Sequence, residues 1–262
     1  MNKLFKQLFF CLVFFIISCK KESTDPAFVD TPIVQAYLSP GNPVSLNITR
    51  QTPFSSNAQY SSDNINALKV FITTNNKTYT LTPIGNGQYV DSSLIVSDTS
   101  QYSLSFGFNG KTVTASTPIP SKPENFGESE TSITVSSTFS FGTIPEPLRL
   151  GWSNTDGSYY IVVVKNIETD PVLIDTSSNA PSFSFVQPPT TSDSELINGR
   201  QFKYYGKTLL ILYHVNPDYA ALYNNSTTSS QNLTPPSSDI TNGYGIFTGL
   251  NADTLTINVK SE

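Results

Sequence analysis

Cys19 is the residue whose surroundings point most directly to a chemical reaction. Lys3 and Lys6 precede an apolar run over residues 8–17, and Ser18 and Cys19 follow it. A positively charged start, an apolar run of about ten residues and a small residue at its end are typical of a secretory signal. The run is too short to cross a bilayer comfortably as a helix. A thiol at the cleavage point can be acylated, which would attach the mature chain to a membrane through lipid.

The tetrapeptide IISC that ends at Cys19 resembles a loose form of the bacterial lipoprotein signal, with Ser18 where Ala or Gly is usual. The sequence therefore predicts a signal peptide over residues 1–18, lipidation of Cys19 and a polar tether over residues 19–31. Cys11 leaves with the signal, so the mature chain has no second cysteine with which to form a disulfide. We expect the hydrophobic core alone to hold the fold.

His214 is the only histidine, and it follows Tyr213 inside an expected strand. General acid–base chemistry or metal binding would need partners at a recognisable spacing, and the sequence offers none. Asp156-Gly157 lacks the further acids of a cation loop, so a turn is expected there. The glycines of residues 243–249 do not open a helix as a phosphate-binding loop does, and we expect them to supply turns and a bulge around an inward Phe247. We predict no enzymatic activity, no metal site and no cofactor.

The charge balance argues against nucleic acid as a partner. The 262-residue chain has a formal net charge of −5, and removal of residues 1–18 takes away two lysines and brings it to −7. An acidic chain without a basic stripe is a poor candidate for binding a polyphosphate. Only 13% of the residues are charged, and 18 Pro and 14 Gly accompany many β-branched residues, which indicates strands and turns.

Short alternating runs fill residues 32–117. Residues 33–38 and 44–48 are expected strands, the second with clean period-two alternation. Asn75-Asn76 and Asn109-Gly110 offer hairpin turns, since both positions of such a turn need a positive φ. About seven short strands in about 85 residues match the count and spacing of an immunoglobulin-like β-sandwich.

A second block follows a predicted stiff, proline-rich linker over residues 118–126. This block, residues 127–262, contains LRLGW at 148–152, a turn, and a strand with Tyr160 that together resemble the second and third strands of a fibronectin type III domain. There we expect Trp152 to fill the sandwich centre. Further expected strands include a hairpin of residues 202–206 with 209–215, and two closing strands, 244–247 and 255–259.

The only convincing helix is short and inserted between strands, over residues 217–223. Asn216 can cap it, Pro217 fits its first turn, and Asp218 favours its positive end. A two-turn helix is marginal in water unless its apolar face packs on something. We therefore expect this helix to lie on the sandwich.

Tyr219, Leu222 and Tyr223 share one face of the helix. We expect Tyr219 and Leu222 to pack inward, and we predict a binding patch formed by Tyr223, Asn224 and Asn225. The chain has 13 Tyr against one Trp, with tyrosines concentrated in the second block. Tyrosine suits protein interfaces and sugar-facing platforms, although the same residues could simply complete the sheets.

Four segments together resemble a family of lipoproteins from Bacteroidota that is described only as a domain of unknown function. They are the lipoprotein start at Cys19, IVQAYLSPG at 33–41, the helix start PDY at 217–219, and DITNGYGIFTG at 239–249. Family members commonly have Asn-Ile where this chain has Asp-Ile at the start of the last segment. The resemblance covers nearly the whole mature chain. It implies a lipid-anchored outer-membrane protein, often encoded beside TonB-dependent transporters, with no established activity.

We expect an all-β protein of two β-sandwich domains, immunoglobulin-like and then fibronectin type III-like, with one short inserted helix. The expected function is a non-catalytic accessory held on the outer membrane through Cys19, on its periplasmic face or at the cell surface. Its partner would be a TonB-dependent transporter or the ligand of one. The alternative is a cell-surface adhesin or glycan-binding module, which would bind a glycan without a protein partner.

Overall fold

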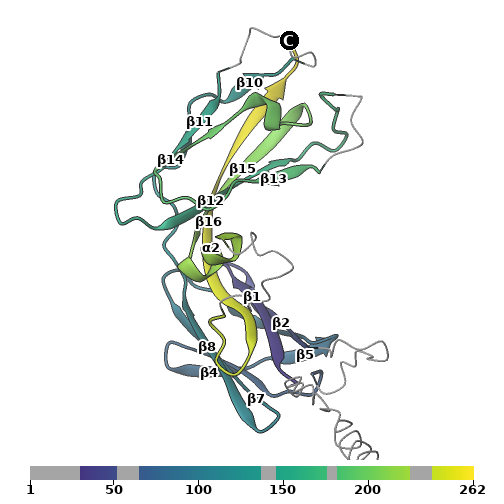
Figure 1. Ribbon diagram of the computed structural model, residues 1–262, viewed down its shortest axis with the longest axis vertical. Helices are drawn as coiled ribbons and strands as arrows, with labels where there is room; N and C mark the ends of the chain where they lie inside the picture. Colours follow the sequence, from purple (N-terminus) through teal and green to yellow (C-terminus); the bar gives the residue numbers. More distant parts are fainter. Residues whose placement is uncertain (1–29, 52–64, 137–145, 176–181, 225–237) are drawn as a thin grey trace, which may run out of the picture.

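The computed structural model describes residues 30–51, 65–136, 146–175, 182–224 and 238–262. Over these residues the chain is all-β with one α-helix, and its strands form two lobes joined end to end (Figure 1). Cys19 and Asn225 lie outside the described residues, so the predicted lipidation site and one residue of the predicted binding patch remain predictions.

The first lobe consists of two facing sheets. One contains β1, β2, β6, β5 and the beginning of β16, and the other contains β4, β3, β7 and β8 in that order. Apolar side chains from both sheets meet in one core, as the alternation along the strands predicts. The strands are β1 (Pro32–Leu38), β2 (Pro43–Arg50), β3 (Val70–Thr74), β4 (Lys77–Thr80), β5 (Thr82–Gly85), β6 (Gln88–Ile95), β7 (Gln101–Phe108) and β8 (Lys111–Pro118).

Both predicted hairpin turns of this lobe are confirmed. Asn75 and Asn76, with φ of 48° and 60°, join β3 to β4, and Asn109 and Gly110, with φ of 48° and 74°, join β7 to β8. Two successive positive φ values give the turn the twist that antiparallel strands need. Asparagine and glycine tolerate this region of backbone space better than other residues do.

The second lobe also packs one sheet on another. One sheet, with the strand order β13-β12-β15-β16, faces a three-stranded sheet with the order β14-β11-β9. Strand β10 pairs with the end of β16. Trp152 is buried in the core between them, with its ring centroid 5.6 Å from that of Tyr160, as predicted. The elements are β9 (Gly127–Glu128), β10 (Ser132–Thr134), β11 (Leu148–Gly151), β12 (Tyr159–Asn166), β13 (Ser184–Val186), β14 (Ser194–Ile197), a 3-10 turn (Gly199–Gln201), β15 (Gly206–Val215), the helix α2 (Pro217–Asn224) and β16 (Tyr244–Lys260).

One strand, β16, runs through both lobes (Figure 1). Its residues 244–249 pair in parallel with β1, and from Leu250 onward it pairs antiparallel with β15. Ile240 and Phe247 are buried in the core of the first lobe. The two closing strands expected from the sequence are therefore one strand. The boundary placed at residue 127 also changes, because residues 240–249 complete the first lobe.

The glycines before and within β16 allow close approach of neighbouring backbone. At Gly245 the backbone has φ of 104°, and a Cβ there would fall on the carbonyl oxygen of Val34 in β1. At Gly249 a Cβ would fall on the carbonyl oxygen of Pro118. The inward Phe247 is confirmed, since it is 0% exposed. Close packing against β1 and against the end of β8 is thus the physical reason for glycine at these two positions.

Residues 118–126, predicted as a stiff linker, pack against both lobes. Pro118 is the last residue of β8, and Ile119 is buried in the core of the first lobe. The buried Asn251 of β16 donates a hydrogen bond from Nδ2 to the carbonyl oxygen of Pro120, at 3.1 Å. The segment therefore packs beside β16, and the two lobes meet in a tight seam.

The expected hairpin of residues 202–206 with 209–215 is wrong. Strand β15 starts at Gly206 and has β12 and β16 as its partners. Tyr204 pairs with Leu173 in an isolated bridge, and Phe202 lies in the core of the second lobe without belonging to a strand. The pairing was misassigned because the spacing of apolar residues predicts a strand but does not show which strand pairs with it.

Candidate functional site

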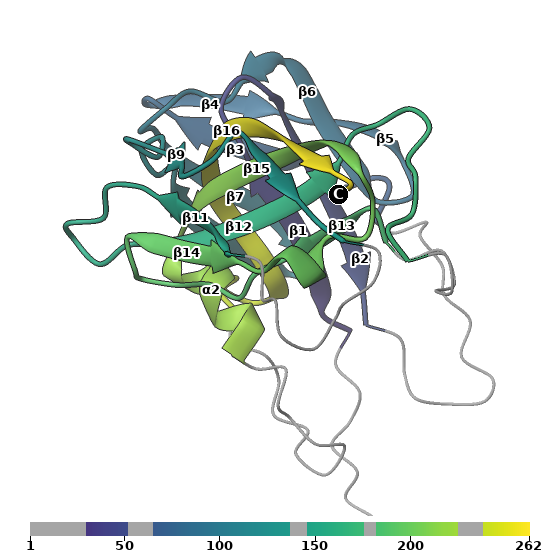
Figure 2. The same ribbon diagram turned by 90° about the horizontal axis from the view of Figure 1, so that it is seen from above.

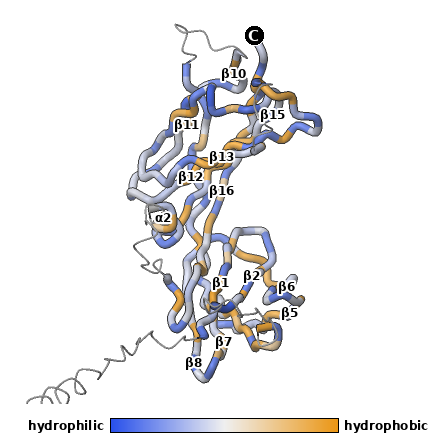
Figure 3. Tube along the Cα trace, turned by 45° about the vertical axis from the view of Figure 1, so that its right-hand side comes forward, coloured by the Kyte–Doolittle hydropathy of each residue, from blue (hydrophilic) through white to orange (hydrophobic). Residues whose placement is uncertain are grey.

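Strands β12 and β15 are apolar on both faces. Val162 and Val164 of β12 face the core of the second lobe, while the alternate residues Ile161 and Val163 face the opposite side. An antiparallel sheet ordinarily presents a polar outer face to water. Figure 3 shows hydrophobic residues along β12 and β13 toward the junction of the lobes. An apolar outer face needs a cover, and among the described residues this sheet has only a partial one.

The helix α2 is that partial cover. It lies outside the sheets (Figure 2), and its Ala220 packs with Ile161 and Val215 in a small cluster of buried residues. Beyond this cluster the same face is open, and Val186 of the edge strand β13 is 46% exposed. The helix prediction is confirmed, with one addition: Ala220 is its most buried apolar residue, while Tyr219 and Leu222 are only partly buried.

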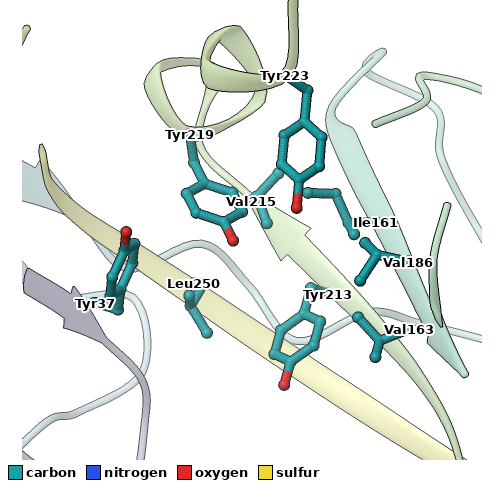
Figure 4. Close-up of a pocket in the computed structure, with 9 residues that line it drawn as sticks. All are labelled: Tyr37, Ile161, Val163, Val186, Tyr213, Val215, Tyr219, Tyr223 and Leu250. Atoms are coloured by element: carbon teal, nitrogen blue, oxygen red, sulfur yellow. The ribbon is translucent and has the colours of Figure 1, made fainter. Parts of the chain in front are cut away.

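The open part of this face is a groove at the junction of the lobes, which we call the tyrosine groove (Figure 4). Its volume is about 290 Å³. The floor crosses five adjacent strands in the order β1, β16, β15, β12 and β13, and α2 forms one wall. Its lining residues are Tyr37, Ile161, Val163, Val186, Tyr213, Val215, Tyr219, Tyr223 and Leu250.

The aromatic rings of the groove support one another edge to face. The ring centroids of Tyr37 and Tyr219 are 5.7 Å apart at an interplanar angle of 84°, and those of Tyr219 and Tyr223 are 6.0 Å apart at 71°. This arrangement is favoured by the ring quadrupoles. Tyr219 and Tyr223 point from α2 toward the sheet (Figure 4). The groove therefore combines aliphatic side chains of the strands with phenol groups from both the strands and the helix.

The groove is electrically neutral. Among the described residues that line it, none is Asp, Glu, Lys, Arg or His. Burial, and then the neighbouring Tyr223, raises the pKa of Tyr219 and also that of Tyr37. These phenols consequently stay protonated at physiological pH and act as hydrogen-bond donors and acceptors. This lining favours reversible binding and offers no general acid or base matched to neutral pH.

Side chains at the start of α2 fix the helix to the seam between the lobes. The Nδ2 of Asn216 donates to the carbonyl oxygens of Pro118 and Gly249, at 2.9 and 3.0 Å. The hydroxyl of Thr248 donates to Oδ1 of Asp218 at 3.1 Å. Asn216, predicted as a helix cap, thus ties the helix to both connections between the lobes. The tyrosine wall is held in place by these bonds.

Of the predicted binding patch, the structure describes Tyr223 and Asn224. Tyr223 lies on the rim of the groove and is 36% exposed, and Asn224 is the last residue of α2. Leu222 points to a different cleft, described below. Tyr37, Tyr213 and the other floor residues were not predicted from the sequence as part of a site. A signal for part of them existed, because residues 159–164 and 209–213 are continuous apolar runs, which predict strands that are apolar on both faces.

A second cleft of about 220 Å³ lies on another side of α2, where Leu222, Asp218 and Asp239 meet. The Oδ1 of Asp239 accepts a hydrogen bond from the backbone N–H of Phe247 at 3.4 Å, while Oδ2 is buried with no partner among the described residues. Burial, and then the charge of Asp218, raises the pKa of Asp239 to about 6. This carboxyl group is a local cost to folding at neutral pH.

Asp239→Asn is expected to stabilise the protein at pH 8 by about 1–2 kcal/mol, after allowance for solvent screening of a half-buried group. The folded pKa of Asp239 lies above its unfolded value of 3.8. Wild-type stability from this group is therefore full below pH 3.8 and is lost as pH rises through about 6. Urea unfolding at pH 8 and pH 4 should show the gain at pH 8 and little gain at pH 4.

Asp91→Asn is the matched control for that experiment. The hydroxyl of Ser93 and nearby backbone N–H groups lower the pKa of Asp91. Its removal should therefore reduce stability at pH 8, the opposite sign from Asp239→Asn. An Asp239→Asn gain that is equal at both pH values would contradict the assigned ionisation.

His214 lies in a third cleft, of about 180 Å³, with Lys122, Glu124 and Asp156. Its ring stacks on Tyr160 at a centroid distance of 4.8 Å, and Nδ1 lies 2.9 Å from the carbonyl oxygen of Ser121. This contact fixes the segment between the lobes to β15. Asp156-Gly157 forms the expected turn, with Gly157 at φ of 73°. Within the described ranges, no group of three or more His, Cys, Asp and Glu could hold a metal ion.

Comparison with known proteins adds a family and a structural likeness. A solved structure of the FN1–FN3 domains of chicken CNTN1 matches with 11% sequence identity and a TM-score of 0.28. The match covers 88% of this chain and 65% of that chain, so this chain spans about two thirds of its length. Comparison with curated proteins gives no match. In the part of the chain that the structure describes, no helix is both long and apolar enough to cross a membrane.

The model of one protein family matches almost the whole sequence. The match runs over residues 23–256, which includes both lobes, the helix α2 and most of β16. The family is described as a domain of unknown function. The chain therefore belongs to the DUF4249 family.

Proposed function

We propose that this chain is a non-catalytic binding protein of the outer membrane, anchored through lipid on Cys19, that engages a TonB-dependent transporter or the ligand of one. The observation that carries the proposal is the tyrosine groove. It is an apolar, uncharged site at the junction of the two lobes. Partly exposed aromatic side chains around a preformed cavity are typical of binding surfaces.

The position of the groove suits a lipid-anchored protein. Strand β1 starts at the far end of the first lobe and ends near the groove, to which it contributes Tyr37 (Figure 1). A tether from Cys19 would reach the first lobe at that far end. The first lobe would then face the membrane and hold the groove away from it. We further assign the first lobe to an immunoglobulin-like sandwich and the second to a fibronectin type III-like one, supported by the separate core of each.

The alternative is a surface adhesin or glycan-binding module, and the tyrosine rings are the observation that favours it. Sugars stack their apolar faces on aromatic rings and also need many hydrogen bonds for their hydroxyl groups. Apart from tyrosines, the groove is lined by Val, Ile and Leu. Such a floor leaves sugar hydroxyls without partners, so we place this function second.

The experiment is site-specific crosslinking in intact cells. A photo-crosslinking amino acid replaces Tyr223 at the groove rim, or Ile84 of β5 as a control, since Ile84 is 60% exposed on the first lobe. We expect position 223 to crosslink a defined outer-membrane protein and position 84 not to do so. The same protein with Cys19→Ala should be released from the membrane and lose the crosslink while its melting curve is unchanged.

Two results would contradict the proposal. Retention of the Cys19→Ala variant in the membrane fraction after a high-salt wash would refute the lipid anchor. Identical crosslinks from positions 223 and 84 would show that the groove has no specific partner. Crosslinking of position 223 to polysaccharide alone would support the adhesin or glycan-binding alternative.

A further inference from the structure

We infer that the occupant of the tyrosine groove is an uncharged segment of a partner protein that inserts one or two apolar side chains, aromatic or branched, into it. The inference rests on the proposed binding function and names the chemistry of the partner. Three features of the groove carry it: the origin of its floor, its lack of charge and its size.

The floor is a continuation of the surface that α2 already covers. Directly paired residues place Val186 beside Val163, Ile161 beside Tyr213, and Val215 beside Leu250. These neighbours share one face of the sheet, as residues opposite each other in antiparallel strands do. The helix covers Ile161 and Val215 with the side chain of Ala220. An apolar side chain from a partner would cover the remainder of the face in the same way and remove it from water.

The neutrality of the lining excludes a charged occupant. A charge brought into this cavity would lose water and find no opposite charge among the described lining residues. A phenol hydroxyl both donates and accepts, so those of Tyr37 and Tyr213 can serve the backbone N–H and C=O groups that accompany an inserted side chain. An uncharged stretch of polypeptide therefore matches both the floor and the rim.

The size of the groove fits side chains better than an extended polymer. Its volume of about 290 Å³ is at the lower limit of ligand pockets, which span roughly 300–1,000 Å³. Binding energy at protein interfaces is concentrated where aromatic or aliphatic anchors fill such pockets, with tyrosine frequent among the surrounding residues. The groove is a small pocket of this kind, lined by tyrosine and aliphatic side chains.

The inference is tested with small probes on the purified full mature chain, labelled at its Ile, Leu and Val methyl groups. The probes are N-acetyl-tryptophanamide, N-acetyl-leucinamide, N-acetyl-lysinamide and methyl glucoside. We expect the first two to shift the NMR signals of Val163, Val186 and Leu250 saturably. The lysine amide and the glucoside should bind at least tenfold more weakly.

A charge placed on the rim provides the variant. Val186→Glu changes an exposed side chain of an edge strand, and it should weaken binding of the tryptophan amide at least tenfold while the melting curve stays the same. Ile84→Glu changes an exposed apolar residue on the first lobe, away from the groove, and should leave binding unchanged.

The outcomes separate this inference from the proposed function. Binding of the glucoside without the tryptophan or leucine amide, or no saturable shift with any probe, would overturn the inference. So would unchanged binding by Val186→Glu. None of these results affects the crosslinking experiment in cells. A groove that binds the apolar amides while position 223 crosslinks nothing in cells would support the inferred chemistry and refute the transporter partnership.

Discussion

Gly245→Ala is expected to lower the free energy of unfolding by about 3–5 kcal/mol, at the upper end of single-substitution effects. Two costs add at this position. The backbone has φ of 104°, which a residue with a Cβ adopts only under strain. The new Cβ would also fall on the carbonyl oxygen of Val34, which belongs to β1 and cannot move without breaking the parallel pairing of β1 with β16.

Gly110→Ala separates these two costs and serves as the control. Gly110 has φ of 74° in the β7–β8 turn, and a Cβ there would meet nothing within 4 Å. Gly110→Ala should therefore lower the free energy of unfolding only by the backbone strain, roughly 1–2 kcal/mol. Urea unfolding of both variants measures the difference. If Gly245→Ala is no more destabilising than Gly110→Ala, the backbones of β16 and β1 do not lie as close together at this position as described.

Trp152→Ala is expected to cost about 3–5 kcal/mol, the range for truncation of a large buried aromatic residue. Trp152 is 6% exposed in the core of the second lobe and packs against Tyr160. Its indole Nε1 is buried with no hydrogen-bond partner among the described residues, so packing is the main contribution that the truncation removes.

The size of the Trp152 effect is measured by denaturant unfolding, with Trp152→Phe as the matched variant. Phenylalanine keeps much of the apolar contact and removes the unpartnered N–H, so its cost should be clearly smaller than that of alanine. An unchanged unfolding curve for Trp152→Ala would refute the assignment of Trp152 to the core.

Local features of the fold could be predicted from the sequence. The Asn-Asn and Asn-Gly turns required positive φ values at fixed places, and the proline and acid at the start of α2 located that helix within one residue. Trp152 was placed correctly because the inward alternation of Leu148 and Leu150 continues to it, just after β11, in a pattern that resembles a fibronectin type III strand. Each of these depends on residues that are close together in the chain.

Pairing between distant strands could not be predicted in the same way. The parallel contact of β1 with β16 joins segments about 210 residues apart, and nothing in the period of either strand names the other. The same limit applies to the groove. Tyr223 was identified from its helix, but Tyr37 reaches the groove only because β1 lies beside β16.

The continuity of β16 has a consequence for how this protein can be divided. In a string of independent modules, each unit can be excised, duplicated or exchanged between genes without harm to its neighbours. Here a chain ending at residue 126 would leave β1 without its partner β16, and a chain starting at residue 127 would carry residues 244–249 of β16 without their partner β1. We therefore expect the two lobes to fold, and to be exchanged between proteins, only as one unit.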